Sequence, residues 1–153
     1  MRISTKGRYA LRMLTDIAQH DAEGCVSLKD VAERLDISKK YLEQLSLGLT
    51  QAGLLRGSRG HQGGYRLARS ASEIRVGEVL AVMEGSLAPN VCLEENGESL
   101  CESCAGCITL PFWRGLDEMI AAYLDACTLQ QVLEGRLPRF SVLPPESLTP
   151  PGE

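Results

Sequence analysis

The chain has 153 residues, 44% of them hydrophobic, which is enough for one domain with a modest extension. No apolar run approaches the length that spans a bilayer, so the composition argues against a membrane protein. The first residues lack the apolar segment and cleavage site of a signal peptide, and we therefore expect a cytoplasmic protein with reduced thiols.

The net charge of −4 is divided unevenly along the chain. Residues 1–75 carry 13 Lys and Arg against 8 Asp and Glu, a net +5. Residues 76–153 carry 3 against 12, a net −9. A basic half joined to an acidic half predicts that the first half meets a polyanion such as nucleic acid.

The chain opens with apolar residues at helical spacing over residues 6–20, and Thr5 is the expected N-cap. A turn is predicted over residues 21–26. Cys25 lies within that turn, and we expect it to be a small core residue, because no other cysteine is near it in sequence.

Two short helices are predicted next, joined by a tight turn. The first covers residues 28–35 after Ser27, and the second covers residues 39–53 after Ser38, with both serines as N-caps. The second helix begins with two lysines. This arrangement is typical of a helix-turn-helix, although an ordinary helical hairpin gives the same pattern.

A β-hairpin is predicted after these helices, with strands at Leu54–Gly57 and Tyr65–Ala68 around a glycine-rich tip. Arg59 in the tip suits a phosphate or a narrow minor groove. A phosphate-cradling loop is disfavoured, because the tip joins two strands and no GK[ST] sequence occurs. Three helices followed by such a hairpin predict a winged helix-turn-helix, whose third helix enters the major groove.

The second half predicts a helix over residues 74–85 and a long amphipathic helix over residues 112–127. The apolar stripe of the long helix comprises Phe112, Leu116, Met119, Ile120, Tyr123, Leu124 and Cys127. We expect this stripe to meet a second subunit, the alternative being packing within the chain. A short helix is predicted over residues 128–137, and the proline-rich tail is expected to be extended or disordered.

The expected fold class is therefore mainly α with a small β-wing. It combines a winged helix-turn-helix DNA-binding domain with a long dimerisation helix. We assign residues 1–85 to the DNA-binding domain, 86–110 to a cysteine-rich loop, 111–137 to the dimerisation helix and a short terminal helix, and 138–153 to a flexible tail.

Four of the six cysteines lie in the loop, at Cys92, Cys101, Cys104 and Cys107. Three thiols within seven residues, among polar neighbours, indicate an iron–sulfur cluster or a zinc site more than packing or a disulfide. The C-x2-C-x2-C run matches the start of a ferredoxin pattern, although Pro111 stands where a fourth cysteine would be. Iron–sulfur is favoured because the two separated knuckles of a four-cysteine zinc site are absent, but spacing alone leaves zinc open. No nucleophile–base pair, HExxH or P-loop suggests an enzyme.

The chain resembles the IscR-type winged-helix transcription regulators. The resemblance rests on KGRYA (6–10), YLEQL (41–45), RGHQGGYRLA (59–68), VGEV (76–79) and FWRGL after the cysteine loop. It implies a homodimer with crossed long helices, a palindromic double-stranded operator, and an iron–sulfur cluster, 2Fe–2S in preference to 4Fe–4S. The DNA-binding positions expected are Ser38, Lys39, Lys40, Tyr41, Glu43, Gln44, Arg59, His61 and Gln62.

The resemblance also implies Cys92, Cys101 and Cys107 as cluster ligands. IscR has a histidine three residues after its last cysteine, and this chain has Leu110 there. The fourth ligand is therefore open among Cys104, Glu43 and His61, where the last two belong to the DNA-binding half.

The function implied is a regulator of iron–sulfur cluster assembly genes that senses cluster status. Two alternatives stay open: a nitric-oxide or thiol-redox sensing regulator of the same fold, and a small iron–sulfur redox protein. The basic first half disfavours the redox protein.

Overall fold

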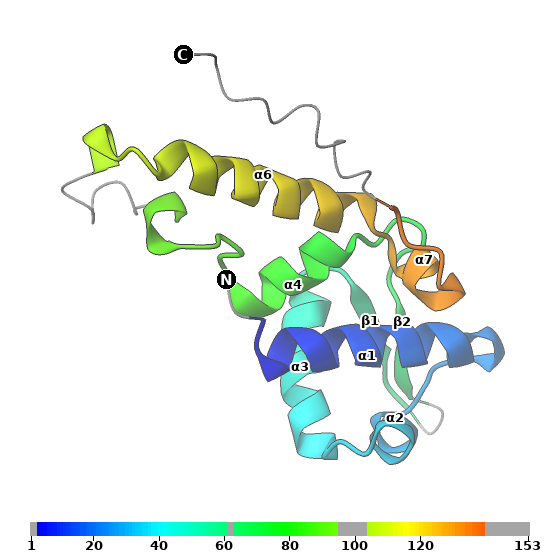
Figure 1. The fold of residues 1–153 in the computed structure, drawn as a ribbon. Helices are drawn as coiled ribbons and strands as arrows, with labels where there is room; N and C mark the ends of the chain where they lie inside the picture. Colours follow the sequence, from blue (N-terminus) through cyan, green and yellow to red (C-terminus); the bar gives the residue numbers. More distant parts are fainter. Residues whose placement is uncertain (1–2, 61–62, 95–103, 140–153) are drawn as a thin grey trace.

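The computed structural model describes residues 3–60, 63–94 and 104–139 (Figure 1). His61, Gln62 and Cys101 therefore lie outside the described residues, as does nearly all of the predicted tail. The helices are α1 (Thr5–His20), α2 (Leu28–Leu35), α3 (Lys39–Gln51), α4 (Val76–Glu84), α6 (Leu110–Ala126) and α7 (Leu129–Glu134). Strands β1 (Leu55–Ser58) and β2 (Gly64–Leu67) form one antiparallel pair, and 3-10 turns occur at Asp21–Glu23, Val91–Leu93 and Cys104–Gly106. The predicted fold class, mainly helical with a small β-wing, is confirmed.

Helix α1 is the centre of the core, and its apolar positions Ala10, Met13, Leu14 and Ile17 are fully buried. Its N-cap is Ser4, so the prediction of Thr5 was wrong by one residue. The reason is tertiary: one carboxylate oxygen of Glu84, at the end of α4, accepts hydrogen bonds from the Ser4 amide and hydroxyl and from the Gly7 amide, each 3.0 Å long. These bonds tie the start of α1 to α4.

The helix-turn-helix of α2 and α3 begins at the two predicted caps. The Ser27 side chain accepts a hydrogen bond from the Asp30 amide, and that of Ser38 accepts one from the Tyr41 amide. Helix α3 ends at Gln51, two residues earlier than predicted. Gly53 follows with φ +70°, a backbone conformation that stops the helix and that glycine adopts without strain.

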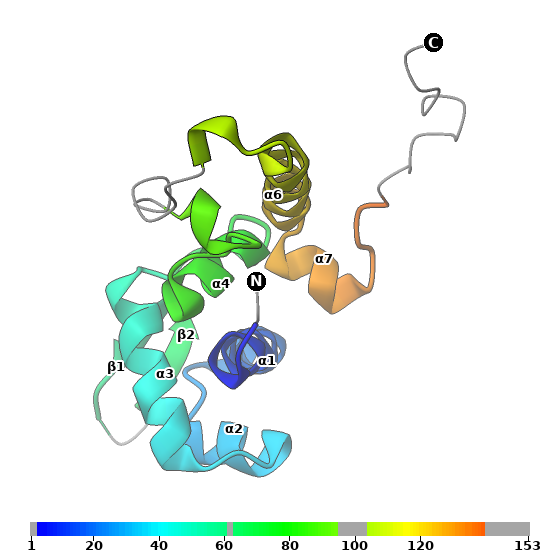
Figure 2. The same cartoon turned by 60° about the vertical axis from the view of Figure 1, so that its left-hand side comes forward.

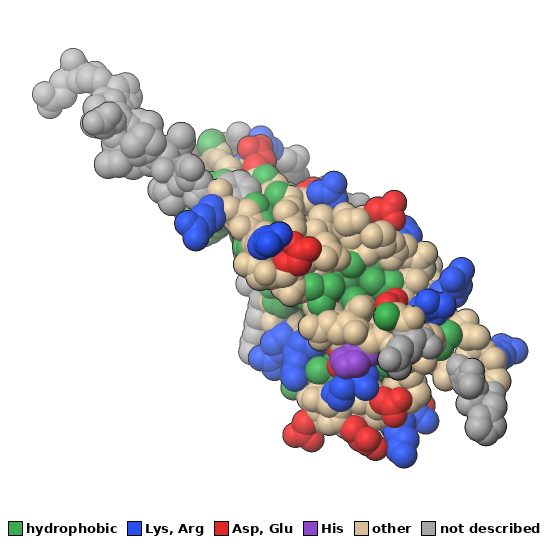
Figure 3. All heavy atoms as spheres, turned by 90° about the vertical axis from the view of Figure 1, so that its right-hand side faces the viewer, with side chains coloured by type: hydrophobic (Ala, Val, Ile, Leu, Met, Phe, Trp, Pro, Cys, Tyr) green, Lys and Arg blue, Asp and Glu red, His purple; other side chains and the backbone are tan. Residues whose placement is uncertain are grey.

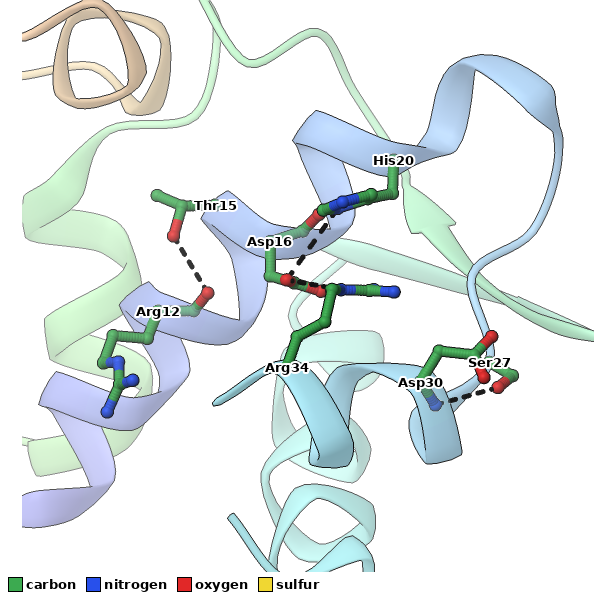
Figure 4. Close-up of polar contacts among 7 residues, drawn as sticks. All are labelled: Arg12, Thr15, Asp16, His20, Ser27, Asp30 and Arg34. Carbon is green, nitrogen blue, oxygen red and sulfur yellow. Dashed lines mark hydrogen bonds and ion pairs between the residues drawn. The ribbon is translucent and has the colours of Figure 1, made fainter. Parts of the chain in front are cut away.

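An ion pair joins α1 to α2 (Figure 4). The buried carboxylate of Asp16 accepts two hydrogen bonds from Arg34, at 2.9 and 2.6 Å. The interaction with this carboxylate raises the pKa of Arg34 above its ordinary value. His20 lies beside the pair, with Nδ1 2.7 Å from the Asp16 carbonyl oxygen. The helix-turn-helix is thus held to α1 by a bidentate contact as well as by apolar packing.

The wing begins and ends close to the predicted positions, with β1 starting one residue later and β2 starting and ending one residue earlier than expected. Its base is fixed by an isolated bridge between Val26 and Tyr65, whose amides and carbonyls exchange hydrogen bonds of 2.9 and 2.8 Å. Val26 is buried by this bridge, while neighbouring Cys25 is half-exposed, so the expectation that Cys25 lies in the core was wrong.

Helix α4 packs against α1, and α6 lies above α4 at one end of the molecule (Figures 1 and 2). Helix α4 starts at Val76, two residues later than predicted, because the Ile74 carbonyl instead accepts a backbone hydrogen bond from the Leu129 amide of α7. Leu129 is fully buried in the same core as α1, so the chain returns to the DNA-binding domain after α6. Within the described residues, no helix is long and apolar enough to cross a membrane.

The long helix α6 begins at Leu110, with Pro111 in its first turn, and has no fully buried residue. Its stripe divides between two environments. Leu124 and Cys127 pack against Val76 and Leu80 of α4, so this part of the stripe serves intrachain packing rather than a second subunit. Phe112 and Met119 remain 65% and 62% exposed.

Candidate nucleic-acid interface and cysteine segment

The outer face of α3 carries most of the predicted DNA-binding residues. Ser38, Lys39, Lys40, Glu43 and Gln44 are exposed on it. The opposite face is buried at Leu42, Leu45 and Leu49, and this holds the helix on the core. Helix α3 and the wing lie on the same side of the molecule (Figure 2). The first turns of α3 therefore present polar and basic side chains next to the wing, as a recognition helix requires.

Glu43 pairs with Lys39 one turn earlier on α3. Lys39 Nζ lies 3.6 Å from Glu43 Oε1, and the two side chains are 59% and 53% exposed. A pair this exposed contributes little to stability. It leaves both side chains able to change partner when an anion or a base edge approaches.

Tyr41 differs from its neighbours because it is half-buried. Its ring meets the ring of Tyr9 on α1 edge-on at 5.9 Å, and within the described residues its buried hydroxyl has no hydrogen-bond partner. The guanidinium groups of Arg8 and Arg12 lie 5.2 and 5.6 Å from the centroid of the Tyr9 ring. Tyr41 thus connects α3, through Tyr9, to two exposed arginines of α1. The sequence analysis did not single out Arg8 and Arg12, although their spacing of four residues places them on one face of the helix.

The wing is connected to α3 through Tyr65. Ser46 Oγ of α3 donates a hydrogen bond to the Glu43 carbonyl and lies 3.2 Å from the Tyr65 hydroxyl. An open hollow of about 290 Å³ lies between the start of α2, the Lys39–Glu43 pair and the wing base at Gly63–Tyr65. Arg59 is exposed near the wing tip. The hollow thus brings Lys39 and Glu43 of α3 next to the base of the wing.

The structure describes residues 86–94 and 104–110 of the cysteine-rich loop, which we call the cysteine segment. Cys92 lies in the Val91–Leu93 turn and is half-buried, Cys104 begins the Cys104–Gly106 turn and is buried, and Cys107 is half-buried just before α6. A hydrogen bond with the Thr109 side chain, 3.2 Å from the sulfur, is the main cause that lowers the pKa of the Cys107 thiol. A more acidic thiol is a better metal ligand and a better nucleophile.

In the part of the chain that the structure describes, no three His, Cys, Asp or Glu side chains converge on one point. The predicted ligand Cys101 lies outside that part. Leu110 forms the first residue of α6 and offers no donor atom. The first turns of α3 lie toward α2, whereas the turns Val91–Leu93 and Cys104–Gly106 lie toward the α6 end of the molecule (Figures 1 and 2). Within one chain, the start of α3 is therefore remote from these two turns.

An open groove of about 930 Å³ separates α4 from α6, and the segment 85–94 forms its third wall. Ile120, Leu124 and Leu93 contribute apolar surface, while Glu78 and Asp117 contribute acidic side chains. The groove thus lies between Leu93 and Glu94, which follow Cys92, and the α6 residues from Asp117 to Asp125.

Comparison with known proteins places these features in one family. Residues 3–135 match the family Rrf2, described as iron-dependent transcriptional regulator. The chain is 40% identical over 136 residues to the HTH-type transcriptional regulator IscR of Serratia proteamaculans. The aligned region covers 89% of this chain and 81% of that protein. It is 39% identical over 133 residues to IscR of Photobacterium profundum, covering 87% of this chain and 76% of the relative.

Solved structures agree with this placement. IscR of T. potens superposes with a TM-score of 0.70 at 36% identity, over 99% of this chain and 94% of that one. CymR, the global cysteine regulator of B. subtilis, gives 0.68 at 33% identity, over 88% and 98%. These relatives are transcriptional regulators and not enzymes, and they carry the winged-helix fold that the residues predicted. The chain belongs to the Rrf2 family and is an IscR-type transcriptional regulator.

Proposed function

We propose that the chain acts as a homodimer that senses iron–sulfur cluster status and controls iron–sulfur cluster assembly genes through a palindromic operator. The observation that carries this proposal is the position of the cysteine segment. It lies in sequence between α4 and α6, and residues 85–94 line the groove between these helices, so a change in its conformation would act on both. The similarity to IscR proteins over nearly nine-tenths of the chain supports the same reading.

Cys92, Cys101 and Cys107 would supply three thiolates to the cluster. The described residues fit this role, because Cys107 is a partly exposed thiol with a lowered pKa and Cys92 is accessible in a short turn. A bound cluster would supply a redox-sensitive crosslink among these thiolates. Cys104, or Glu43 or His61 of a partner subunit, would complete the set.

The dimer would form through the exposed part of the α6 stripe. Phe112 and Met119 leave large apolar surfaces in solvent on a helix that projects beyond α4 (Figure 1). Such a surface on one side of a helix is typical of an interface between identical subunits. Two recognition helices related by a twofold axis would then read two halves of a palindrome.

Anaerobic purification tests the cluster directly. We expect brown protein with comparable amounts of iron and sulfide, and loss of both when Cys92, Cys101 or Cys107 is changed to Ala. Parallel Cys104→Ala, Glu43→Ala and His61→Ala variants identify the fourth ligand by which of them alone loses the cluster. Colourless protein that carries zinc would contradict the cluster assignment.

Glu43 is the residue we expect to link the cluster to base choice. A carboxylate facing DNA accepts hydrogen bonds only from donors such as cytosine N4, so it penalises other base pairs by about 1–3 kcal/mol. Its pair with Lys39 leaves it free to move when the cysteine segment changes. Two operators, each tested with wild type and Glu43→Ala, with and without cluster, measure this link. Identical site preference and cluster retention in the variant would rule it out.

Thiol-redox sensing without a cluster is the second candidate. The partly exposed Cys107 thiol, whose pKa is lowered by its hydrogen bond with Thr109, favours it. It predicts that metal-free protein changes its DNA affinity upon mild oxidation and recovers with a thiol reductant. If the chain were instead a small iron–sulfur redox protein, it would bind no operator.

A further inference from the structure

The outer face of the wing carries two arginines directly opposite each other. Arg56 of β1 is in register with Arg66 of β2, and both are exposed. Strand alternation puts Leu55, Leu67 and Tyr65 on the inner face, toward the core and α3. The two guanidinium groups therefore project from the face of the hairpin that is turned away from α3.

Like charges directly opposite each other on paired strands destabilise a sheet. No carboxylate relieves this pair within the described residues. Arg66 donates a hydrogen bond to the Asp21 backbone carbonyl, at 3.3 Å, and in the described part of the chain neither Arg56 nor Arg66 belongs to an ion pair. The nearby Arg69 is already bound to Glu78 at 2.5 Å. Arg56 and Arg66 thus form a cationic pair that no ion pair among the described residues neutralises.

Both arginines line a hollow of about 360 Å³ between the wing, the end of α1 and α7. Ser70 and Gln130 add polar groups to its wall, and Asp21 is the acidic residue on it. Figure 3 looks onto this side of the molecule, where Lys and Arg side chains lie on both flanks of a hydrophobic strip. The hollow is open and polar, which suits an oxyanion better than an apolar ligand.

The position of the pair favours DNA as the source of that oxyanion. Arg56 precedes Arg59 by three residues of extended chain, about 10 Å at the rise of a β-strand. DNA that contacts Arg59 at the wing tip and runs on along the hairpin would reach the outer face of the wing. Planar guanidinium groups bind phosphate oxygens with two parallel hydrogen bonds, so two opposed arginines match one or two backbone phosphates.

We propose that Arg56 and Arg66 bind backbone phosphates of DNA outside the segment read by α3, with the hollow beside them receiving the phosphate oxygens. This proposal rests on DNA binding by the wing and extends the contact beyond the operator core. The pair adds affinity for flanking DNA of any sequence, because phosphate contacts carry no base information.

The test compares two duplexes obtained by in vitro selection against the full chain. One is trimmed to the selected core, and the other keeps one further helical turn, about 10 base pairs, on each side. Fluorescence anisotropy over a range of salt concentrations gives affinity and salt slope for each. We expect wild type to bind the long duplex about tenfold more tightly, with a salt slope steeper by about 1–2.

The double variant Arg56→Ala/Arg66→Ala should bind both duplexes alike, with the affinity of wild type for the core. The matched control Arg136→Ala/Arg139→Ala removes the same charge at exposed positions and should keep the preference for the long duplex. A double variant that keeps this preference would overturn the proposal. A second result would also overturn it: inorganic phosphate binds the arginine pair with a dissociation constant below about 1 mM, yet saturating phosphate leaves the preference for the long duplex unchanged. If the wild-type protein did not bind the core duplex at all, the result would instead count against the proposed DNA binding itself.

Discussion

Individual polar side chains in this chain act through partners that are distant in sequence. Glu84 fixes the start of α1, Asp16 holds Arg34 of α2, and Ser46 connects α3 to Tyr65 of the wing. Each contact joins two elements, and together these contacts fix the positions of α3 and the wing, which we propose bind one duplex. Single substitutions at such positions can therefore separate stability from DNA binding.

Thr109 tunes the Cys107 thiol. Thr109→Val removes the hydroxyl that holds the Cys107 pKa low, so the pKa rises toward its ordinary value. The thiolate fraction near pH 7 falls, and we expect slower alkylation of Cys107 by iodoacetamide in metal-free protein, followed by fragment mass spectrometry. Well above the thiol pKa both proteins should react alike. Thr109→Ser keeps the hydroxyl and should restore the rate; an unchanged rate in Thr109→Val would contradict this role.

Asp16 contributes to stability through its bidentate contact. Asp16→Asn leaves Arg34 without its anionic partner, and we expect the free energy of unfolding to fall by about 2 kcal/mol, less than for a fully buried pair because Arg34 is one-third exposed. Urea denaturation measures this loss. The control Glu33→Gln breaks an exposed pair with Lys29 and should change stability by less than about 0.5 kcal/mol. Equal effects of the two changes would show that burial of Asp16 is unimportant.

At the scale of elements, the wing depends on close backbone approach. A Cβ on Gly64 would lie 2.4 Å from the Val26 carbonyl oxygen, and one on Gly63 would lie 2.7 Å from that of Ser58. Only glycine fits at these points, because the neighbouring atoms are backbone. The glycines thus fix the wing on the start of α2, beside the recognition helix.

Gly64→Ala should push the wing away from Val26 while the helices stay folded. We expect an unchanged helical circular dichroism spectrum and operator binding weakened about tenfold, roughly 1.4 kcal/mol. Gly57→Ala is the matched control on the other strand, since its Cβ would meet the Tyr65 ring at an ordinary 3.5 Å. Normal DNA affinity in the Gly64 variant would mean that wing position is not critical.

At the scale of the whole molecule, the apolar stripe of α6 has two environments, one buried against α4 and one exposed to solvent. Leu124 and Cys127 close the core over α4, while Phe112 and Met119 face solvent in the single chain. Gly77 permits the close crossing, since a Cβ there would lie 3.2 Å from Leu124. The stripe therefore attaches the helix at its C-terminal end and leaves Phe112 and Met119 exposed, where the proposed second subunit would bind.

Met119→Asp should give folded monomers, because the side chain is 62% exposed in one chain but would be buried, charged and unpaired in a dimer. Analytical ultracentrifugation measures the mass, and thermal unfolding reports the fold. Leu124→Asp places a carboxylate inside the chain's own packing and should lower stability whatever the subunit number. A Met119→Asp protein that sediments like wild type would reject this interface.

The sequence alone determined the elements that depend on nearby residues. Helical spacing, the caps at Ser27 and Ser38 and the glycines of the wing act within a few positions, so the winged helix-turn-helix was predictable. The exposed face of α3 followed from the same periodicity. The three-thiol pattern and the family resemblance suggested the candidate ligands, of which Cys92, Cys104 and Cys107 fall in the described part of the chain.

The tertiary structure decided what depends on contacts between distant segments. Ser4 rather than Thr5 caps α1 because Glu84 reaches it from α4. Tyr41 turns from the DNA face toward Tyr9 because α1 crosses α3 there. Leu129 enters the main core, and Leu124 packs against α4 while Met119 stays exposed, because α6 meets α4 along only part of its length. Periodicity identifies an apolar stripe, but only the neighbouring helices determine which half of it the chain covers itself.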